Sequence, residues 1–511
     1  MLRILTLCGI LLGGILSPVG AATYYIDSVA GNDAAAGTSP ATAWKNLSAF
    51  NQKEYAAENP VVAGDSLLLK YGSVWADSLY VRFNHTTIDA YGDSTLGKPI
   101  IDGSDSLTTY AGGTGNVYTA TLDGMPKDEL PIIYINSVRA LPQAGSAAAV
   151  DAEGEWFWTA ATNTLTFCTD TPAAVRIPKR QWGVATKYQT PTPATGLAIR
   201  NVAVTRTHLQ GIKLNLGCDS SRVEYCTVYN NSGYDYNDAN AIDVDASYCT
   251  ISHCVVRNSG ANAIDITSEP GYNTVEYCHV SNSAHHAFDT KDGAGHRFVF
   301  NIAIDDPDFV APARTVENSG NHFYIGYSNA STAYVSANTY VYGNIAAYCY
   351  KGNGFQVTGD ADNMTTGVRL YHNVAYDNDG HQLLLTGWTG TVDAKNNILV
   401  VARGISTQRT LTVNDTTNKT VDYNIHWRSD GGTLAQLQSG SLLTTLAGIR
   451  AYGRETHGKQ QDPLLDTTTF AVPANSPAAN TGYRWVEGNV WWVPATCGRY
   501  QLPVLRRYKL F

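Results

Sequence analysis

Three aspartates with matching neighbours recur along the middle of the chain, at Asp243, Asp265 and Asp289. They are separated by 22 and 24 residues, and each one follows a short apolar segment. If these segments are strands in a stack of similar coils, the coils lie about 4.8 Å apart and the carboxylates form a row. Carboxylates that close repel one another and raise one another's pKa unless a cation intervenes. The spacing therefore predicts acid–base or metal chemistry.

Two kinds of chemistry suit such a row. In the first, the carboxylates bind Ca²⁺, which prefers several oxygen ligands. The ion neutralises a uronate carboxylate, and a base then removes the adjacent proton so that the glycosidic oxygen is eliminated. In the second, two carboxyl groups act as acid and base, or as acid and nucleophile, in glycoside hydrolysis. For the first chemistry the expected calcium ligands are Asp243, Asp245, Asp265 and Asp289.

The residues next to Asp289 offer several bases for the elimination. Lys291 lies two residues further along the chain, on the same face of an extended strand. Tyr324, assisted by His322, is a second candidate. His285 and His286 precede the strand, and each is expected to be a base, a ligand of a softer metal or a hydrogen-bonded turn residue.

Other residues are candidates for binding substrate. Arg297 and Arg314 are expected either to clamp a substrate carboxylate or to be surface charges. Gln356 and His322 lie on strands that follow the aspartates and are expected to contact substrate. Against all these roles stands a structural alternative, in which aspartates at strand ends only cap turns.

The elements that position these residues follow a period. One β-rich template carries Cys226, Cys254 and Cys278, and asparagine then takes the same place at Asn301, Asn344, Asn373 and Asn397. The spacings are 28, 24, 23, 43, 29 and 24 residues, which indicate stacked coils with an insertion at about 305–340. The cysteines are expected to be buried packing thiols rather than disulfides.

The segments are short and rich in strand-forming residues, with no length for crossover helices between them. The chain is therefore predicted to be all-β, a single right-handed parallel β-helix domain with loop insertions. Stacking the coils predicts one outward ladder, formed by Lys213, Asp243, Asp265, Asp289, Tyr324, Gln356 and Leu384.

The organisation along the chain is predicted as follows. Residues 1–22 read as a secretory signal peptide, and 23–511 as the β-helix domain. Within it, 23–104 form the N-terminal cap and first coils, 105–196 an irregular insertion, 197–430 the regular coils carrying the site, and 431–511 the C-terminal coils and cap. Trp156 and Trp158 in the insertion either stack on sugar rings or cover the β-helix.

The opening segments, such as Tyr24-Tyr25-Ile26-Asp27-Ser28, resemble those of secreted proteins of the pectin-lyase-like superfamily. Over about residues 200–400 the chain is most similar to the family-nine pectate lyases. In that family, aspartates on successive coils bind Ca²⁺, and Asp265 and Asp289 match two of those positions. The resemblance implies a calcium-dependent polysaccharide lyase. The chain departs from the family where an Asp-Asp pair is replaced by His285-His286 and where the base lysine falls on Tyr324 or Gln356.

Composition limits the partners. The net charge of −9 shows no basic footprint, so a nucleic-acid partner is not expected. No stretch after the signal is long and apolar enough for a membrane span. We expect a monomeric protein, extracellular or periplasmic, that cleaves an acidic polysaccharide by metal-assisted β-elimination. The alternatives are a glycoside hydrolase using paired aspartates, a uronate epimerase, and a non-catalytic glycan-binding protein or adhesin.

Overall fold

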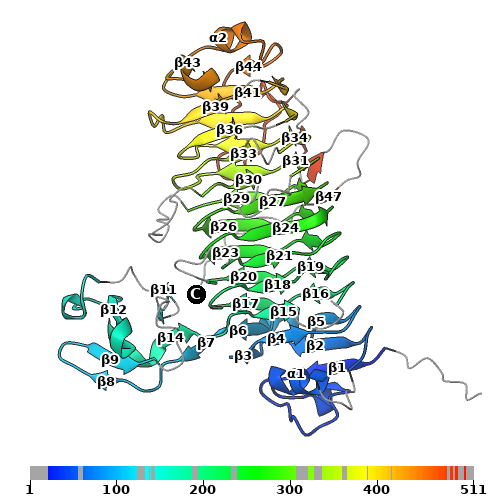
Figure 1. Cartoon of the computed structure of the whole chain (residues 1–511), viewed down its shortest axis with the longest axis vertical. Helices are drawn as coiled ribbons and strands as arrows, with labels where there is room; N and C mark the ends of the chain where they lie inside the picture. The colour runs from blue at the N-terminus through cyan, green and yellow to red at the C-terminus, as the bar shows by residue number, and fades with distance from the viewer. Residues whose placement is uncertain are drawn as a thin grey trace, which may run out of the picture.

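In the computed structural model the chain forms a three-sided, right-handed parallel β-helix (Figure 1). Three sheets of 12 strands run along its length, and each coil contributes one strand to each sheet. The prediction of a single all-β parallel β-helix is confirmed. The structure describes residues 21–55, 61–122, 133–136, 138–139, 144–186, 194–231, 239–306, 320–326, 336–359, 365–387, 390–415, 417–479, 484–486, 490–492 and 500–501.

The three sheets are named A, B and C here, and neighbouring strands within them are parallel except for the last pair of sheet C. Sheet A consists of β1 (Thr23–Ile26), β2 (Ser66–Lys70), β5 (Thr87–Tyr91), β16 (Ala198–Arg200), β19 (Arg222–Glu224), β22 (Thr250–Ser252), β25 (Thr274–Glu276), β28 (Arg297–Val299), β31 (Tyr340–Tyr342), β34 (Val368–Tyr371), β37 (Val392–Lys395) and β40 (Lys419–Asp422). Sheet B consists of β3 (Val74–Trp75), β6 (Ile100–Asp102), β17 (Ala203–Thr205), β20 (Thr227–Tyr229), β23 (Val255–Ser259), β26 (His279–Ser283), β29 (Ile302–Ile304), β32 (Ile345–Ala347), β35 (Val374–Tyr376), β38 (Ile398–Val401), β41 (Ile425–Arg428) and β44 (Lys459–Gln460). Sheet C consists of β4 (Leu79–Val81), β15 (Val184–Thr186), β18 (Ile212–Leu214), β21 (Ile242–Val244), β24 (Ile264–Gly271), β27 (Phe288–Ala294), β30 (Phe323–Ile325), β33 (Phe355–Gly359), β36 (His381–Gly387), β39 (Arg409–Val413), β42 (Ala435–Leu437) and β43 (Ser441–Leu443).

The turn between sheets A and B explains the period in the sequence. In successive coils one residue of this turn has a left-handed backbone, with φ of 55° at Tyr225, 54° at His253 and 54° at Tyr277. The side chains of these residues stack on one another, with ring centroids 4.7 and 5.2 Å apart. Because the chain bends here from sheet A to sheet B, the next residue points inward, and this is the place that the cysteines and asparagines occupy.

The inward asparagines form a continuous hydrogen-bonded column, which we call the amide stack: Asn301, Asn344, Asn373, Asn397 and Asn424. Each of the first four side-chain nitrogens donates to the side-chain oxygen of the next asparagine, at 2.9–3.1 Å, and the side-chain nitrogen of Asn424 donates to Glu455 at 2.7 Å. Each nitrogen also donates to a backbone carbonyl of the preceding coil, as Asn344 does to Phe298 at 2.8 Å. Every amide in the column is buried and has its polar atoms engaged.

The cysteines fill the same place at the other end of this column. Cys226, Cys254 and Cys278 are buried and unbridged, as predicted. The thiol of Cys278 lies 3.6 Å from the carbonyl oxygen of Ile251, which corresponds to the carbonyl that an asparagine would engage. A thiol is therefore a small substitute for the amide at this position.

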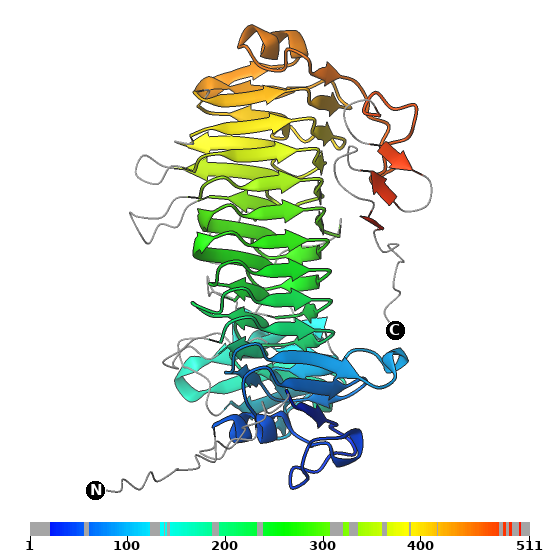
Figure 2. The same cartoon turned by 90° about the vertical axis from the view of Figure 1, so that its right-hand side faces the viewer.

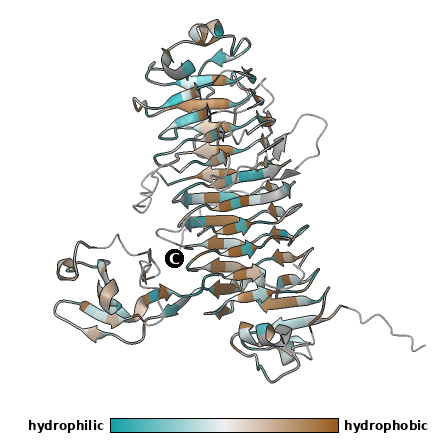
Figure 3. Cartoon of the chain, viewed as in Figure 1, coloured by the Kyte–Doolittle hydropathy of each residue, from teal (hydrophilic) through white to brown (hydrophobic). Residues whose placement is uncertain are grey.

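The core between the sheets is apolar and continuous along the β-helix. Its aromatic part is a column of Phe288, Phe323 and Phe355, whose rings stack at centroid distances of 4.6 and 4.8 Å. In Figure 3 the apolar residues appear as bands that repeat from coil to coil along the strands. This regular interior fixes the register of sheet C, on whose outward face the candidate site lies.

The N-terminal end is covered by α1 (Leu47–Tyr55), whose Leu47 and Phe50 are buried against the first coils. A small lobe then projects to the side of the β-helix (Figure 1). It holds two antiparallel sheets, formed by β7 (Ser104–Ser106), β10 (Tyr134–Ile135), β11 (Val138–Arg139) and β14 (Val175–Pro178), and by β8 (Ala111–Gly112), β9 (Val117–Thr121), β12 (Trp156–Thr159) and β13 (Thr164–Cys168).

The lobe corrects two predictions. Trp156 and Trp158 are 2% and 4% exposed and pack in the lobe's own core, so they do not form a sugar-stacking surface or cover the β-helix. The insertion also ends earlier than residue 196, because β15 at 184–186 already pairs with β4 and β18 in sheet C. The reason is that the repeated cysteine or asparagine template lies in the turn between sheets A and B, whereas β15 is a strand of sheet C and does not carry it.

At the other end, α2 (Leu446–Ala451) covers the last coil. The chain then runs back outside the β-helix, where Phe470 and Val472 pack against sheet B (Figure 2). A small antiparallel sheet follows, formed by β45 (Arg484–Val486), β46 (Val490–Trp492) and β47 (Tyr500–Gln501). Among the described residues, no helix is long and apolar enough to cross a membrane.

Candidate active site

The outward ladder of sheet C has the predicted register. Lys213 pairs with Asp243, Asp243 with Asp265, and Asp265 with Asp289. The ladder continues from Asp289 to Tyr324, Gln356 and Leu384. We call Asp243, Asp265 and Asp289 the aspartate row. Their residues are 4%, 5% and 0% exposed, so three carboxyl groups on adjacent strands are nearly removed from water.

Asparagines three residues before the aspartates hold the row in place. The side-chain nitrogen of Asn262 donates to the Oδ2 atoms of both Asp265 and Asp289, at 3.0 and 2.7 Å. Asn240 donates to Asp265 from the preceding coil, at 2.9 Å. The hydroxyl of Thr267 reaches the other oxygen of Asp265, at 3.2 Å. Asp265 therefore accepts hydrogen bonds on both oxygens and has the best-satisfied carboxylate of the row.

Asp289 has a different environment. Its Oδ2 lies 3.0 Å from the ammonium of Lys291, while its Oδ1 is buried and has no hydrogen-bond partner among the described residues. Burial raises the pKa of Asp289 to about 7, against the opposing effect of Lys291. Near neutral pH this group is therefore partly a carboxylic acid, and Oδ1 is the oxygen positioned to carry the proton.

Lys291 reaches Asp289 because the strand is irregular at this point. The pairing of β24 with β27 shifts after Ile266, so that Thr267 pairs with Asp292 and Lys291 is the extra residue. The negative charge of Asp289 raises the pKa of Lys291, with a further contribution from Asp265. Lys291 is therefore a cation at neutral pH, which suits charge compensation better than proton abstraction.

The other end of the row is also occupied by a lysine. The ammonium of Lys213 lies 2.7 Å from Asp243 and 2.6 Å from Asp245. Burial raises the pKa of Asp243, and Asp245 and Asp265 add to this effect while Lys213 opposes it. The two carboxylates in turn raise the pKa of Lys213, although burial lowers it. The aspartate row thus lies between two ammonium groups that the protein itself supplies.

His286 belongs to a structural column. Its ring nitrogen Nδ1 accepts a hydrogen bond from the backbone N–H of Asn321 at 3.0 Å. The backbone N–H of His286 donates to the side-chain oxygen of Asn262 at 3.1 Å. Asn321 and Asn353 continue the column on the next two coils. His286 takes the place of an asparagine in this column, and its ring stacks on Tyr324 at 4.4 Å. His285 is half-buried, and its Nδ1 lies 2.7 Å from the side-chain oxygen of Asn262.

Of the residues predicted to bind substrate, only some lie near the aspartate row. Gln356 is in the ladder and accepts a hydrogen bond from Asn353 at 3.0 Å. His322 is 2% exposed and lies 3.3 Å from Asp305, in a turn beside the ladder rather than on its outward face. Arg297 is exposed on β28 of sheet A, away from the aspartate row. Arg314 lies outside the described residues.

The donor set does not fit a calcium site. Ca²⁺ requires several oxygen atoms with free lone pairs around one position. Here Lys213 and Lys291 contact the outer aspartates, and three side-chain donors contact Asp265. The ammonium groups supply the positive charge that calcium would bring. Calcium binding stays a prediction, and chelation tests it.

Sequence reasoning missed the groups that support the row. Asn240 and Asn262 stand three residues before an aspartate in the same repeat, and this spacing was the signal that could have identified them. Lys213 was placed in the ladder without a role, although a lysine beside aspartates is the expected counter-charge.

A cavity of about 670 Å³ opens in the lobe, and its lining includes Thr108, Tyr110 and Lys179. None of its lining residues belongs to the aspartate row. Its walls combine apolar residues and hydroxyl groups with the charged side chains of Asp105 and Lys179, without the row of carboxyl groups that distinguishes sheet C.

Comparison with known proteins gives limited matches. No family model matches the chain. Part of the sequence is similar to a lacto-N-biosidase from Bifidobacterium longum subsp. longum, with 38% identity over 107 residues. The match covers 18% of this chain and 6% of that relative, so it spans a small part of the relative's length.

Solved structures agree on the fold. The complex structure of XylC with xylose has a TM-score of 0.51 and 11% identity, covering 87% of this chain and 88% of that one. A glycoside hydrolase also has a TM-score of 0.51, with 10% identity over 82% of this chain and 95% of that one. Pectate lyase Pel9A reaches a TM-score of 0.43 with 13% identity, over 94% of this chain and 91% of that one. That likeness is too weak to support the predicted family-nine relationship.

Proposed function

We propose that this protein is a carbohydrate-active enzyme that hydrolyses glycosidic bonds at the aspartate row. The observation that carries the proposal is Asp289, a buried carboxyl group whose pKa is raised to about 7 and whose Oδ1 has no partner among the described residues. The preceding strand, β24, carries Asp265, a carboxylate that accepts three hydrogen bonds. Two carboxyl groups in different environments are the arrangement that general acid catalysis of glycoside cleavage uses.

In the proposed reaction Asp289 donates its proton from Oδ1 to the glycosidic oxygen as the bond to the anomeric carbon breaks. Asp265 attacks that carbon and forms a covalent glycosyl–enzyme ester. Water then adds to the anomeric carbon, Asp289 takes the water's proton, and the ester bond to Asp265 breaks. Because Asp289 is fully buried, the side chains of Lys291 and Tyr324, its partly exposed neighbours, must shift as substrate binds.

The spacing of the two groups supports the covalent route. Both Oδ2 atoms lie within 3.0 Å of the same amide nitrogen of Asn262, which places them closer than the about 6.5–9.5 Å typical of inverting enzymes. There is no room between them for the water that an inverting reaction needs. Products are therefore expected to keep the anomeric configuration of the substrate, which NMR of the first-formed products measures.

We propose an acidic polysaccharide as the substrate. When Asp289 is protonated, its neighbour Lys291 keeps its positive charge and loses its closest counter-charge. A uronate carboxylate bound nearby would replace that charge. The glycoside hydrolase among the structural neighbours and the lacto-N-biosidase similarity add an analogy of fold and of a short segment, not a substrate.

β-Elimination is the second candidate, and one observation favours it. Tyr324 pairs with Asp289 in the ladder, stacks on His286 and interacts electrostatically with Lys291. A tyrosine beside a permanent cation is a reasonable base for a uronate C–H, with Lys291 neutralising the substrate carboxylate. In this mechanism Asp265 and Asp289 hold Lys291 in place and do not react.

One product assay separates these functions. The purified protein is incubated with pectate, alginate, glycosaminoglycans and neutral glycans, with and without a calcium chelator. We expect new reducing ends without ultraviolet-absorbing unsaturated products, and no effect of the chelator. Unsaturated uronate products would show that the reaction is elimination and not hydrolysis. Loss of activity with chelator would establish a role for calcium. No product on any substrate would favour a glycan-binding protein.

We also propose that the protein is exported, on the basis of the apolar segment at residues 4–16. Fractionation of expressing cells tests this. The protein should be found outside the cytoplasm, with an N-terminus near Thr23.

A further inference from the structure

A second cluster of reactive side chains lies beside the ladder, in the turns that join sheets B and C. It consists of Asp305, His322 and Cys349, which come from two neighbouring coils. One donor atom from each lies within 4.8 Å of those of the other two, and His322 Nε2 is 3.3 Å from Asp305 Oδ2. The three residues are 3%, 2% and 2% exposed. Thiol, imidazole and carboxylate thus meet in one buried place.

The imidazole of His322 is not satisfied by the protein. Neither ring nitrogen makes a hydrogen bond of acceptable geometry among the described residues, although the ring is almost fully buried. Asp305 is held in position by the backbone N–H groups of Asn282 and Tyr350, at 2.8 and 3.3 Å. The carboxylate is therefore fixed beside an imidazole that lacks a partner, which is a costly arrangement unless another group occupies the site.

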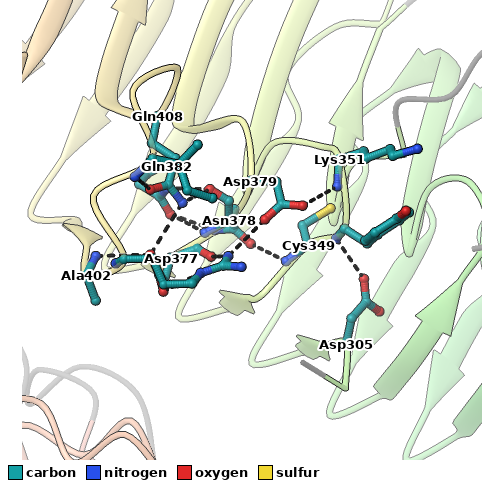
Figure 4. Close-up of polar contacts among 12 residues, drawn as sticks. Asp305, Cys349, Lys351, Asp377, Asn378, Asp379, Gln382, Ala402 and Gln408 are labelled. Atoms are coloured by element: carbon teal, nitrogen blue, oxygen red, sulfur yellow. Dashed lines mark hydrogen bonds and ion pairs between the residues drawn. The ribbon is translucent and has the colours of Figure 1, made fainter. Parts of the chain in front are cut away.

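The same turn is satisfied with amides further along the β-helix. Phe323, Phe355 and Leu383 are equivalent in sheet C, so the residue before Leu383, Gln382, is the counterpart of His322. Gln382 accepts a hydrogen bond from Asn378 at 2.7 Å and donates one back at 3.1 Å. Figure 4 shows this amide group beside Cys349 and Asp305, with Asn378 accepting from the backbone N–H of Cys349. His322 thus stands where Gln382 stands further along, and Cys349 on the next coil stands where Asn378 does, so side chains that can bind a metal occupy places that amides fill elsewhere.

We propose that Asp305, His322 and Cys349 bind a zinc ion that has a structural role. A thiolate and an imidazole favour a borderline-soft divalent metal over calcium or magnesium. In tetrahedral zinc sites with bonds of about 2.0–2.3 Å the donor atoms are separated by about 3.3–3.8 Å, so these donors, which lie within 4.8 Å of one another, need to approach by about 1.5 Å at most. The carbonyl oxygen of Gly320, 3.4 Å from the Cys349 sulfur, or a water completes the four ligands. On binding, the Cys349 thiol loses its proton to solvent and becomes a thiolate.

Such an ion would tie together the base of the long connection between β29 and β30. Asp305 directly follows β29, and His322 directly precedes β30, which carries Tyr324 next to Asp289. Cys349 joins both to the next coil. The site would therefore fix the coil beside the aspartate row, and it does not depend on which reaction the row performs.

Metal analysis of the full chain tests the proposal. The protein is expressed with zinc, purified by gel filtration and analysed for metal content, and a parallel preparation is made with cobalt. We expect about one zinc per chain and, in the cobalt form, a sulfur-to-metal charge-transfer band. Both should be lost in Cys349→Ser and His322→Gln. Cys254→Ser is the matched control, because its thiol is equally buried and contacts a carbonyl rather than imidazole or carboxylate.

Three results would overturn the proposal. One is a chain without zinc after expression in zinc. Another is zinc that remains in both Cys349→Ser and His322→Gln, which would place the ion elsewhere. The third is a cobalt form without the charge-transfer band, since this would exclude the thiolate. If Cys349→Ser fails to fold, His322→Gln, which keeps the thiol and the buried volume, decides the result.

Discussion

Two stacks of polar side chains run along this β-helix, and the same coil spacing has opposite effects on them. In the amide stack, each asparagine both donates and accepts, so every added coil satisfies the one before it. In the aspartate row, neighbours only accept and carry like charges, so every added coil makes ionisation more difficult. The row depends on donors other than its own members, from Lys213, Lys291, Asn240 and Asn262.

The comparison indicates what each stack is for. An amide at each position of the row would have stabilised sheet C without counter-charges. The carboxyl groups that stand there instead are buried, and burial raises the pKa of Asp243 and Asp289. A perturbed pKa beside a specific charge partner is typical of functional sites. The amide stack is explained by folding alone, whereas the perturbed carboxyl groups of the aspartate row are the basis of the proposed catalytic role.

The largest expected effect comes from replacing the row by amides. Asp289→Asn and Asp265→Asn are each expected to lower kcat by about 10²–10⁴-fold, because each removes one partner of the acid–nucleophile pair. The matched control is Asp393→Asn on sheet A, where Lys395 lies two residues away and 3.0 Å from the carboxylate, as Lys291 does from Asp289. An equal loss in the control, or activity unchanged in both row variants, would contradict the catalytic role.

The next effect concerns the amide stack. Asn344→Ala removes an acceptor of the Asn301 backbone N–H and a donor to Phe298, and leaves both buried. We expect the free energy of unfolding to fall by about 2–4 kcal/mol, since each unsatisfied buried group costs about 1–3 kcal/mol. Denaturant unfolding measures this. Asn414→Ala, at an exposed asparagine, should change stability by less than about 0.5 kcal/mol. Similar losses in both variants would show that the stack adds nothing.

A smaller effect is the pH dependence of stability. The pKa of Asp289 is raised from 3.8 to about 7 in the folded protein, so the folded state binds its proton more tightly than the unfolded state. The contribution of Asp289 to the free energy of unfolding is fully present below pH 3.8 and is lost as pH rises towards 7. In this range the free energy of unfolding falls by at most about 1.4 kcal/mol per pH unit on account of this group. Asp289→Asn should flatten this part of the profile. An unchanged slope in the variant would mean that Asp289 titrates normally.

The smallest effect is expected where one stack could be extended. Cys278→Asn places an amide next to Asn301, whose side-chain oxygen already accepts the backbone N–H of residue 278 at 3.0 Å. The new nitrogen can use the Ile251 carbonyl that the thiol now contacts. Because the bonding pattern is retained, stability should change by less than about 1.5 kcal/mol. A loss comparable to that of Asn344→Ala would show that thiol and amide are not equivalent there.

The sequence predicted the fold and the register of the ladder because both follow from the period. If the strand slipped by one residue, Asp265 would point into the core and its apolar neighbours would point to solvent. The apolar pattern therefore fixes which residues share a face. The packing thiols followed from the same repeat. The sequence predicts an insertion at about 305–340. In the structure the extra residues of this range lie before and after β30, between β29 and β30 and between β30 and β31.

What the sequence did not predict depends on irregular backbone. The shift after Ile266 directs Lys291 back to Asp289, and no periodic pattern contains it. The sequence predicts that His322 assists Tyr324 and contacts substrate, but the turn before β30 directs its ring towards Asp305. Arg297 stands four residues before Asn301, in the repeat that forms sheet A, so this repeat separates it from the ladder of sheet C. His286 was considered as a base, although its place in the column of Asn262 and Asn321 is explained by hydrogen bonding.

The most direct test of the account is the titration of Asp289 itself. Infrared difference spectra of the wild-type protein and Asp289→Asn, recorded as a function of pH, isolate the band of this one carboxyl group. A buried acid beside Asp265 is expected to titrate with a midpoint near 7, as burial requires. A midpoint close to 3.8, the ordinary value of an aspartate, would mean that Asp289 is a carboxylate throughout the working range and cannot be the proton donor.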